Sequence, residues 1–391
     1  MRWICLAVLA AICTFLVSAN ARADEPAPLP EAVALAWERY QAASRAGDIE
    51  AAGDAALAAY RAAQAGGVDP LTRAILADTA GQFAFIRNQY AQAIDLLRAA
   101  EALYAPMGDA HINSHVQVLA LLANAYHLNE NNREALRWAD RAISVAGAPG
   151  ADPDRDADIA LAMSVRARTH WRQGSVGRSG EAAREALAVL EPYGLENQTG
   201  AGLMAFYAGV ERALRQRMAE SAWWFGVADY LFTVQGQDRN LTQITEVWSR
   251  YARDRMSSGE RRALIERLNT AGFLSAPERA QAEAELDEAE QQERAEPDLL
   301  NRPARPLRRD APTYPMSAAQ AQLEGIALLT FTVNAQGRVE DAVVVFSAPH
   351  PMFGQEALRT IRRWRYEPRL VDGVPTAHEG LRTTFDFRME G

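Results

Sequence analysis

The chain has 391 residues, of which 49% are hydrophobic and 23% are charged, and its formal net charge is −9. This length allows two or three domains, and the composition is that of an ordinary globular protein. The negative balance argues against a nucleic-acid partner, because phosphate binding requires a basic face.

The first 23 residues have the pattern of a signal peptide. Arg2 supplies a positive start, Ile4–Val17 is an apolar run, and Ala21-Arg22-Ala23 offers small residues at the spacing of a cleavage site. We therefore predict a signal peptide at 1–23 that is removed before Asp24. The apolar run is shorter than the roughly 20 residues that a spanning helix needs. An uncleaved inner-membrane anchor remains the alternative.

The two cysteines, Cys5 and Cys13, both lie in this leader. The chain that starts at Asp24 therefore has none and cannot form disulfides, although export would take it to a space that permits them.

Residues 31–273 have apolar side chains at the three- and four-residue spacing of amphipathic helices. Gly81 and Ala93 recur 42 residues later as Ala123 and Ala135, where small side chains let neighbouring helices approach closely. This segment resembles tetratricopeptide repeats. We predict an all-α helical array, which acts either as a spacer or as a concave peptide-binding groove.

Residues 274–311 change from acidic to basic. Ser275 and Glu278 form the pattern of a capping box at the start of an acidic helix. Few large apolar residues follow, so we predict a solvated spacer that Pro297 ends, and then an extended linker rich in Pro and Arg.

The pattern of residues 312–391 predicts a small α+β domain. A short helix, a hairpin turning at Asn334–Gly337, a helix over Phe353–Trp364 and a closing strand give a three-stranded antiparallel sheet. In the closing strand, Leu381, Thr383, Phe385 and Phe387 share one face, and Arg382, Thr384, Asp386 and Arg388 share the other.

The same segment, at about 312–389, resembles the C-terminal domain of TonB-type energy transducers. The resemblance rests on a series of residues in matching order: Tyr314-Pro315, Glu324-Gly325, Gly337, Ser347, Phe353, Ala357, Trp364, Pro368, Asp372-Gly373 and Phe387.

The resemblance implies that an extended peptide adds as a strand to the edge Gly380–Arg388. The expected peptide is the TonB box of an outer-membrane TonB-dependent transporter, or a segment of another envelope protein. The expected contacts lie at Arg382, Thr383, Thr384, Phe385 and Asp386, and in a first segment at Pro312, Tyr314 and Pro315. Docking of the first helix is the structural alternative for Tyr314 and Pro315. Ala311 replaces the Gln of the best-studied members, which affects side-chain contacts only.

The functional hypothesis is a periplasmic, non-enzymatic interaction protein in TonB-dependent transport. The alternative is an envelope scaffold or adaptor that binds proteins without energy coupling. The resemblance also implies an inner-membrane motor complex as a partner if the leader stays uncleaved. However, no His precedes His111, whereas a typical transducer has a coupling His in its membrane helix.

We expect no catalytic site, cofactor or metal. His111 and His115 have the i, i+4 spacing of zinc ligands, but no third ligand is evident. Ser347 and His350 lie close together, but in a predicted loop whose Ser matches the family pattern structurally, so we expect no nucleophilic catalysis there.

Overall fold

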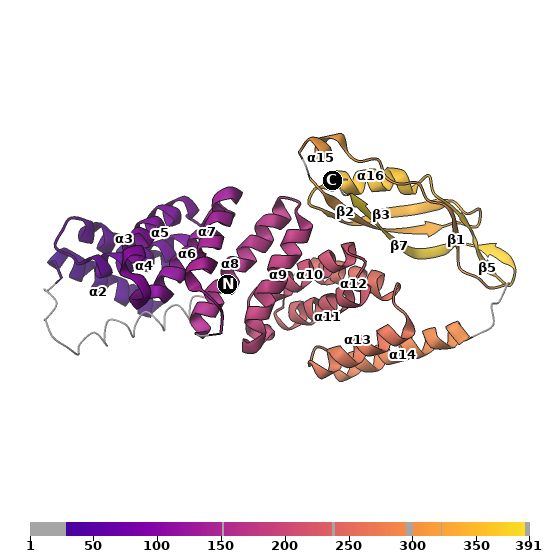
Figure 1. The fold of residues 1–391 in the computed structure, drawn as a ribbon, viewed down its shortest axis with the longest axis horizontal. Coiled ribbons are helices and arrows are strands. Elements are labelled where there is room, and N and C mark those ends of the chain that lie inside the picture. Colours follow the sequence, from indigo (N-terminus) through magenta and orange to yellow (C-terminus); the bar gives the residue numbers. More distant parts are fainter. Residues whose placement is uncertain (1–28, 151, 237–238, 295–299, 322, 388–391) are drawn as a thin grey trace. The chain divides into compact units, whose positions relative to one another are not determined.

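The computed structural model describes residues 29–387 apart from 151, 237–238, 295–299 and 322, and it divides into two units, Met1–Ala148 and Pro149–Gly391 (Figure 1). The predicted signal peptide lies outside the described residues. In the part of the chain that is described, no helix combines the length and the apolar character needed to cross a membrane.

The first unit consists of helix hairpins. They are α2 (Glu31–Ala46) with α3 (Ile49–Gln64), α4 (Pro70–Ile86) with α5 (Tyr90–Tyr104), and α6 (Ile112–Leu128) with α7 (Asn132–Ala146). A 3-10 segment, Ala105–His111, joins α5 to α6.

Small residues set the packing of these hairpins, as the repeat pattern predicts. A Cβ atom at Gly81 would lie 2.8 Å from the Leu97 side chain. Ala93, Ala123 and Ala135 are fully buried.

The second unit begins with further repeats. Its hairpins are α8 (Pro153–Arg172) with α9 (Val176–Leu190), and α10 (Ala201–Leu214) with α11 (Met218–Val234), followed by α12 (Arg239–Arg253). Two 3-10 turns, Glu191–Tyr193 and Leu195–Asn197, join α9 to α10. We call α8–α12 the repeat helices. Together with the first unit they confirm the predicted helical array.

Helices α13 (Ser258–Thr270) and α14 (Ala276–Arg294) form another hairpin. Leu286 of α14 is only 3% exposed, and Arg262 of α13 pairs with Glu290 at 2.6 Å. The acidic helix is therefore packed along α13 rather than being the predicted solvated spacer. One well-placed leucine and an interhelical ion pair provide contacts that a scan for apolar runs does not detect.

The C-terminal part of this unit contains an antiparallel sheet of β2 (Gly325–Val333), β3 (Val339–Ala348) and β7 (His378–Phe387), in the order β3-β2-β7. The same part of the chain contains helices α15 (Met316–Gln320) and α16 (Pro351–Ile361). These elements confirm the predicted α+β domain and its three-stranded sheet.

The C-terminal part also contains two smaller two-stranded sheets. They pair β1 (Arg305–Arg308) with β4 (Arg365–Glu367), and β5 (Arg369–Val371) with β6 (Val374–Thr376). Strand β1 therefore lies inside the segment that the sequence predicts as a linker.

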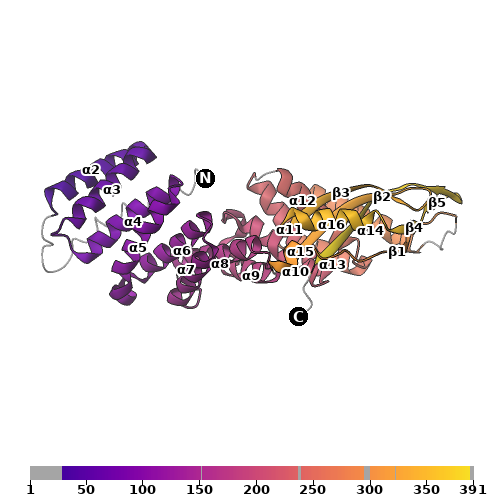
Figure 2. The same ribbon diagram turned by 90° about the horizontal axis from the view of Figure 1, so that it is seen from above.

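The sheet has helices on both faces (Figures 1 and 2). Figure 1 shows α16 on one side and α10 and α12 on the other. We call the side toward α16 the core face. It buries Phe353, Ala357 and Ile361 of α16 against Phe385 and Phe387 of β7.

We call the opposite side, with Ile326 and Leu328 of β2 and Phe346 of β3, the array face. Ile326 is 1% exposed and Leu328 fully buried. Strand β2 is thus buried on both faces at its start and becomes half-buried only toward Thr330 and Thr332. The uninterrupted apolar run Ile326–Leu329 is the pattern of a strand covered on both sides.

Candidate partner-binding edge

Strand β7 presents a regular, open edge. Its pairing with β2 runs without interruption from Leu381, opposite Phe331, to Phe387, opposite Gly325. The one irregularity lies before this run, where Gly380 has a φ of 71° that favours glycine. Among the described strands, none pairs with the other side of β7. The run Leu381–Phe387 therefore has outward backbone donors and acceptors without a strand partner.

Strand β3 forms the opposite edge and is irregular. Its register with β2 shifts twice, between the partners of Leu328 and Leu329 and between those of Thr330 and Thr332. Asp341, near the second shift, has a φ of 48°. Bulges of this kind twist an edge and hinder pairing with a further strand. Of the two edges, β7 is the better template.

The side chains of β7 alternate as predicted. Thr383 and Phe385 are 6% and 4% exposed and point to the core face. On the array face, the Thr384 hydroxyl lies 2.6 Å from the Tyr251 hydroxyl, and Arg382 pairs with Asp254 at 3.5 Å.

Asp386, on the array face, is exposed and borders a hollow that Arg215, just after α10, also lines. Arg388 lies outside the described residues. The side chains that the sequence predicts as partner contacts are thus largely engaged within the chain, and β7 offers mainly its backbone.

The predicted contact segment at Pro312, Tyr314 and Pro315 holds α15, the first helix of the C-terminal domain, in place. The Tyr314 hydroxyl donates to the Leu323 carbonyl at 2.7 Å, and its ring packs edge-on against Phe353 and Phe387. Burial, with the nearby Glu324 and Asp386 carboxylates, raises the pKa of Tyr314. Pro315 directly precedes α15, and Pro312 is half-buried. Tyr314 and Pro315 therefore fit the structural alternative.

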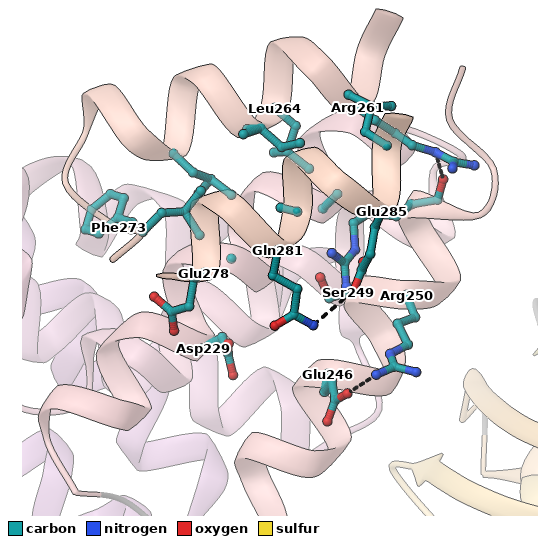
Figure 3. A pocket seen from close by; sticks show the side chains of 18 of the residues that line it. Asp229, Glu246, Ser249, Arg250, Arg261, Leu264, Phe273, Glu278, Gln281 and Glu285 are labelled. Atoms are coloured by element: carbon teal, nitrogen blue, oxygen red, sulfur yellow. Dashed lines mark hydrogen bonds and ion pairs between the residues drawn. The ribbon is translucent and has the colours of Figure 1, made fainter. Parts of the chain in front are cut away.

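A cavity of about 520 Å³ adjoins β7 through Arg382 (Figure 3). Helices α11–α14 form its walls, and Figure 3 shows the Arg250–Glu246 ion pair and a hydrogen bond from Gln281 to Glu285. Burial, together with Glu278 and Glu246, raises the pKa of Asp229 to about 6. The wall thus contains both acidic and basic groups.

Residues that the sequence offers as metal ligands or nucleophiles make structural contacts. His115 is 8% exposed and lies 3.6 Å from Glu101. The Ser347 hydroxyl donates to the His350 carbonyl at 2.9 Å and accepts from the Gly354 N–H at 3.0 Å, which ties the loop to α16. Among the described residues, no group of three or more His, Cys, Asp or Glu side chains could hold a metal ion.

Sequence reasoning missed the contribution of α12. Trp248 and Tyr251 lie on this helix and Asp254 directly follows it, and all three contact β3 or β7. The three-residue spacing of Trp248 and Tyr251, which places them on one helix face, was the available signal. It does not reveal which element that face meets.

The C-terminal part of the chain is similar to known proteins. Residues 310–389 match the family model of the Gram-negative bacterial TonB protein C-terminal. This part of the chain is a TonB C-terminal domain. Protein TonB of Pseudomonas aeruginosa is 32% identical over 122 residues, which cover 31% of this chain and 33% of the relative. The chain thus spans about a third of the length of that TonB.

Solved structures match the two parts separately. The solution structure of the Pseudomonas aeruginosa TonB C-terminal domain is 34% identical and covers 24% of this chain and 93% of its own, with a TM-score of 0.21. The TPR-like repeats of a Podosopora anserina kinesin light chain are 16% identical and cover 59% of this chain and 97% of theirs, with a TM-score of 0.36.

Proposed function

We propose that this protein binds an extended peptide of an envelope protein by adding it as a strand to β7. The first candidate is the TonB box of an outer-membrane TonB-dependent transporter, because the β7 edge belongs to a TonB C-terminal domain. The proposed location is the periplasm, because the predicted signal peptide would direct export of the chain. The role is one of binding, not of catalysis.

The regular edge of β7 carries this proposal. Seven consecutive residues, Leu381–Phe387, pair in continuous register with β2 and have no described strand on their other side. An added peptide would satisfy the outward N–H and C=O groups of this run. The bulged edge at β3 provides no comparable run.

Recognition would rest mainly on the backbone. Thr383 and Phe385 are buried in the domain core, while Thr384 contacts Tyr251 of α12 and Arg382 pairs with Asp254, just after α12. These residues would meet the peptide through their main-chain atoms. We therefore expect affinity to depend on an extended peptide conformation more than on any single peptide side chain.

Energy coupling is a separate question that depends on the leader. The intact mass of the exported protein shows whether the leader has been removed. A chain that starts at Asp24 cannot reach a motor complex through a membrane helix of its own.

The binding mode can be tested on the peptide itself. Synthetic TonB-box peptides from the transporters of the same organism are titrated against the full chain, with scrambled peptides as controls. Each peptide is then N-methylated at alternate residues, in an odd and an even version. Strand addition uses the amides of only one set, since successive residues of a strand point their N–H groups to opposite sides. We expect one version to lose binding and the other to keep it; equal behaviour of both would contradict strand addition.

The edge can be tested on the protein. Asp386→Pro on β7 should weaken binding, because proline has no N–H for a ladder, whereas Val343→Pro on β3 should not. Circular dichroism of both variants checks that they are folded. Loss of binding in the β3 variant alone would place the peptide on the other edge.

A further inference from the structure

The array face of the sheet has the composition of an interface. Ile326 is 1% exposed and Leu328 fully buried, although neither points to the core of its own domain. Across the strands, Leu328 stands between Phe346 of β3 and Thr384 of β7. A small domain with a single covered face normally places polar side chains on the other face. The apolar row therefore requires a cover.

The repeat helices provide an aromatic cover for Phe346. Its ring centroid lies 6.1 Å from that of Trp171 on α8, and 5.8 Å from those of Phe206 on α10 and Trp248 on α12. The contacts with Phe206 and Trp248 are edge-to-face, which is the favoured geometry for aromatic pairs.

Contacts among the repeat helices themselves support this pocket. Trp171 stacks on Tyr207 at 4.4 Å, and Trp248 stacks on Phe225 at 5.7 Å. Trp248 is fully buried. Because neighbours in the array hold both tryptophan rings, the pocket is a built feature of the repeat helices.

Polar and close backbone contacts surround the aromatic centre. The Tyr251–Thr384 hydrogen bond joins α12 to β7, and the Arg382–Asp254 ion pair joins the residue after α12 to the same strand. At the end of α8, a Cβ atom at Gly174 would lie 2.9 Å from Pro349 and 3.1 Å from the Glu324 carbonyl. The interface thus has an apolar centre and a polar rim, as specific interfaces do.

We propose that the repeat helices α8, α10 and α12 are a docking receptor for the array face, with Phe346 as the anchor, and that the two parts act as one body in solution. The TonB C-terminal domain then has a fixed orientation on the array, where Tyr251 of α12 holds Thr384 of the edge strand and Asp254, just after α12, holds Arg382. This arrangement leaves the outward backbone of β7 as the part of the strand open to a partner. The proposal is independent of peptide binding, since it concerns a contact within the chain.

Cross-linking tests the docking directly. Asp254→Cys and Arg382→Cys are introduced together into the chain that starts at Asp24, which contains no other cysteine. A short bifunctional thiol reagent should give an intramolecular product at low protein concentration. The control pair is Asp254→Cys with Arg359→Cys, because Arg359 lies on α16, at the other face of the sheet. We expect little product from this pair.

The role of Phe346 as the anchor is tested in the variant that carries Asp254→Cys and Arg382→Cys. Phe346→Asp should lower the yield of intramolecular product by about tenfold or more, since it places a charge in the aromatic pocket. Val343→Asp, on the same strand but at a side chain that is 57% exposed, should leave the yield unchanged. Trp171→Ala removes part of the pocket without touching the sheet, so it should also lower the yield even if Phe346→Asp fails to fold. An unchanged yield in folded Phe346→Asp and Trp171→Ala, or a product that links two chains, would overturn the proposal.

Discussion

The hydroxyl of Tyr251 lies 2.6 Å from the hydroxyl of Thr384, and this hydrogen bond joins the last repeat helix to the edge strand of the TonB C-terminal domain. The two residues are 133 positions apart in the sequence. Their contact shows that the array face of β7 is engaged inside the chain. The strand therefore has its backbone, rather than its side chains, to offer to a partner.

Removing this hydrogen bond should measurably weaken the interface. Tyr251→Phe and Thr384→Val each remove one hydroxyl, and the double variant removes both. We expect a coupling free energy of about 1 kcal/mol, the usual net value of such a bond. Urea unfolding of the four proteins measures it. Strictly additive single effects would show that the two hydroxyls do not interact.

The close approach of α9 and α10 predicts different effects of two glycine substitutions in α9. A Cβ atom at Gly180 would lie 2.2 Å from the Glu211 Cβ, whereas one at Gly177 would meet nothing within 4 Å. Gly180→Ala should lower the free energy of unfolding by about 2 kcal/mol through overpacking. Gly177→Ala should leave it unchanged or raise it by up to about 1 kcal/mol, because alanine favours helix. Thermal unfolding compares them, and equal effects would contradict the described packing.

Asp229 predicts a pH dependence of stability. Its pKa is raised to about 6 in the folded chain, by burial first and then by Glu278 and Glu246, from an ordinary value of 3.8. Between about pH 4 and pH 6 the folded state binds more protons than the unfolded state, so this group lowers stability as the pH rises.

Asp229→Asn removes this titration. After allowance for partial solvent screening, the variant should be more stable than the native chain by about 1 kcal/mol at pH 7. The advantage should disappear near pH 4, where the native carboxyl is protonated in the folded chain. Urea unfolding at the two pH values checks this, and a variant that is less stable at pH 7 would contradict it.

Periodicity predicted the elements that have a clear local pattern. The alternation of Leu381, Arg382, Thr383 and Thr384 assigned both faces of β7, and the small residue at Gly81 indicated close helix packing. Both follow from spacing along a single element, which sequence displays directly.

Contacts between distant segments could not be predicted in the same way. Strand β1 forms because Arg305 and Pro306 meet Glu367 and Tyr366, about sixty residues later in the chain. The cover of the array face likewise depends on where Trp248 and Phe346 meet, which no local pattern specifies. The apolar run Ile326–Leu329 signalled that some cover exists, but not which one.

Amide hydrogen exchange on the full chain, with and without a TonB-box peptide, tests strand addition at β7 most directly. Peptide binding should slow exchange at alternate amides of Leu381–Phe387, because their outward N–H groups gain acceptors, and should leave Val339–Ala348 on β3 unchanged. Slower exchange on β3 or on the helices alone, with β7 unchanged while the peptide is bound, would contradict the account.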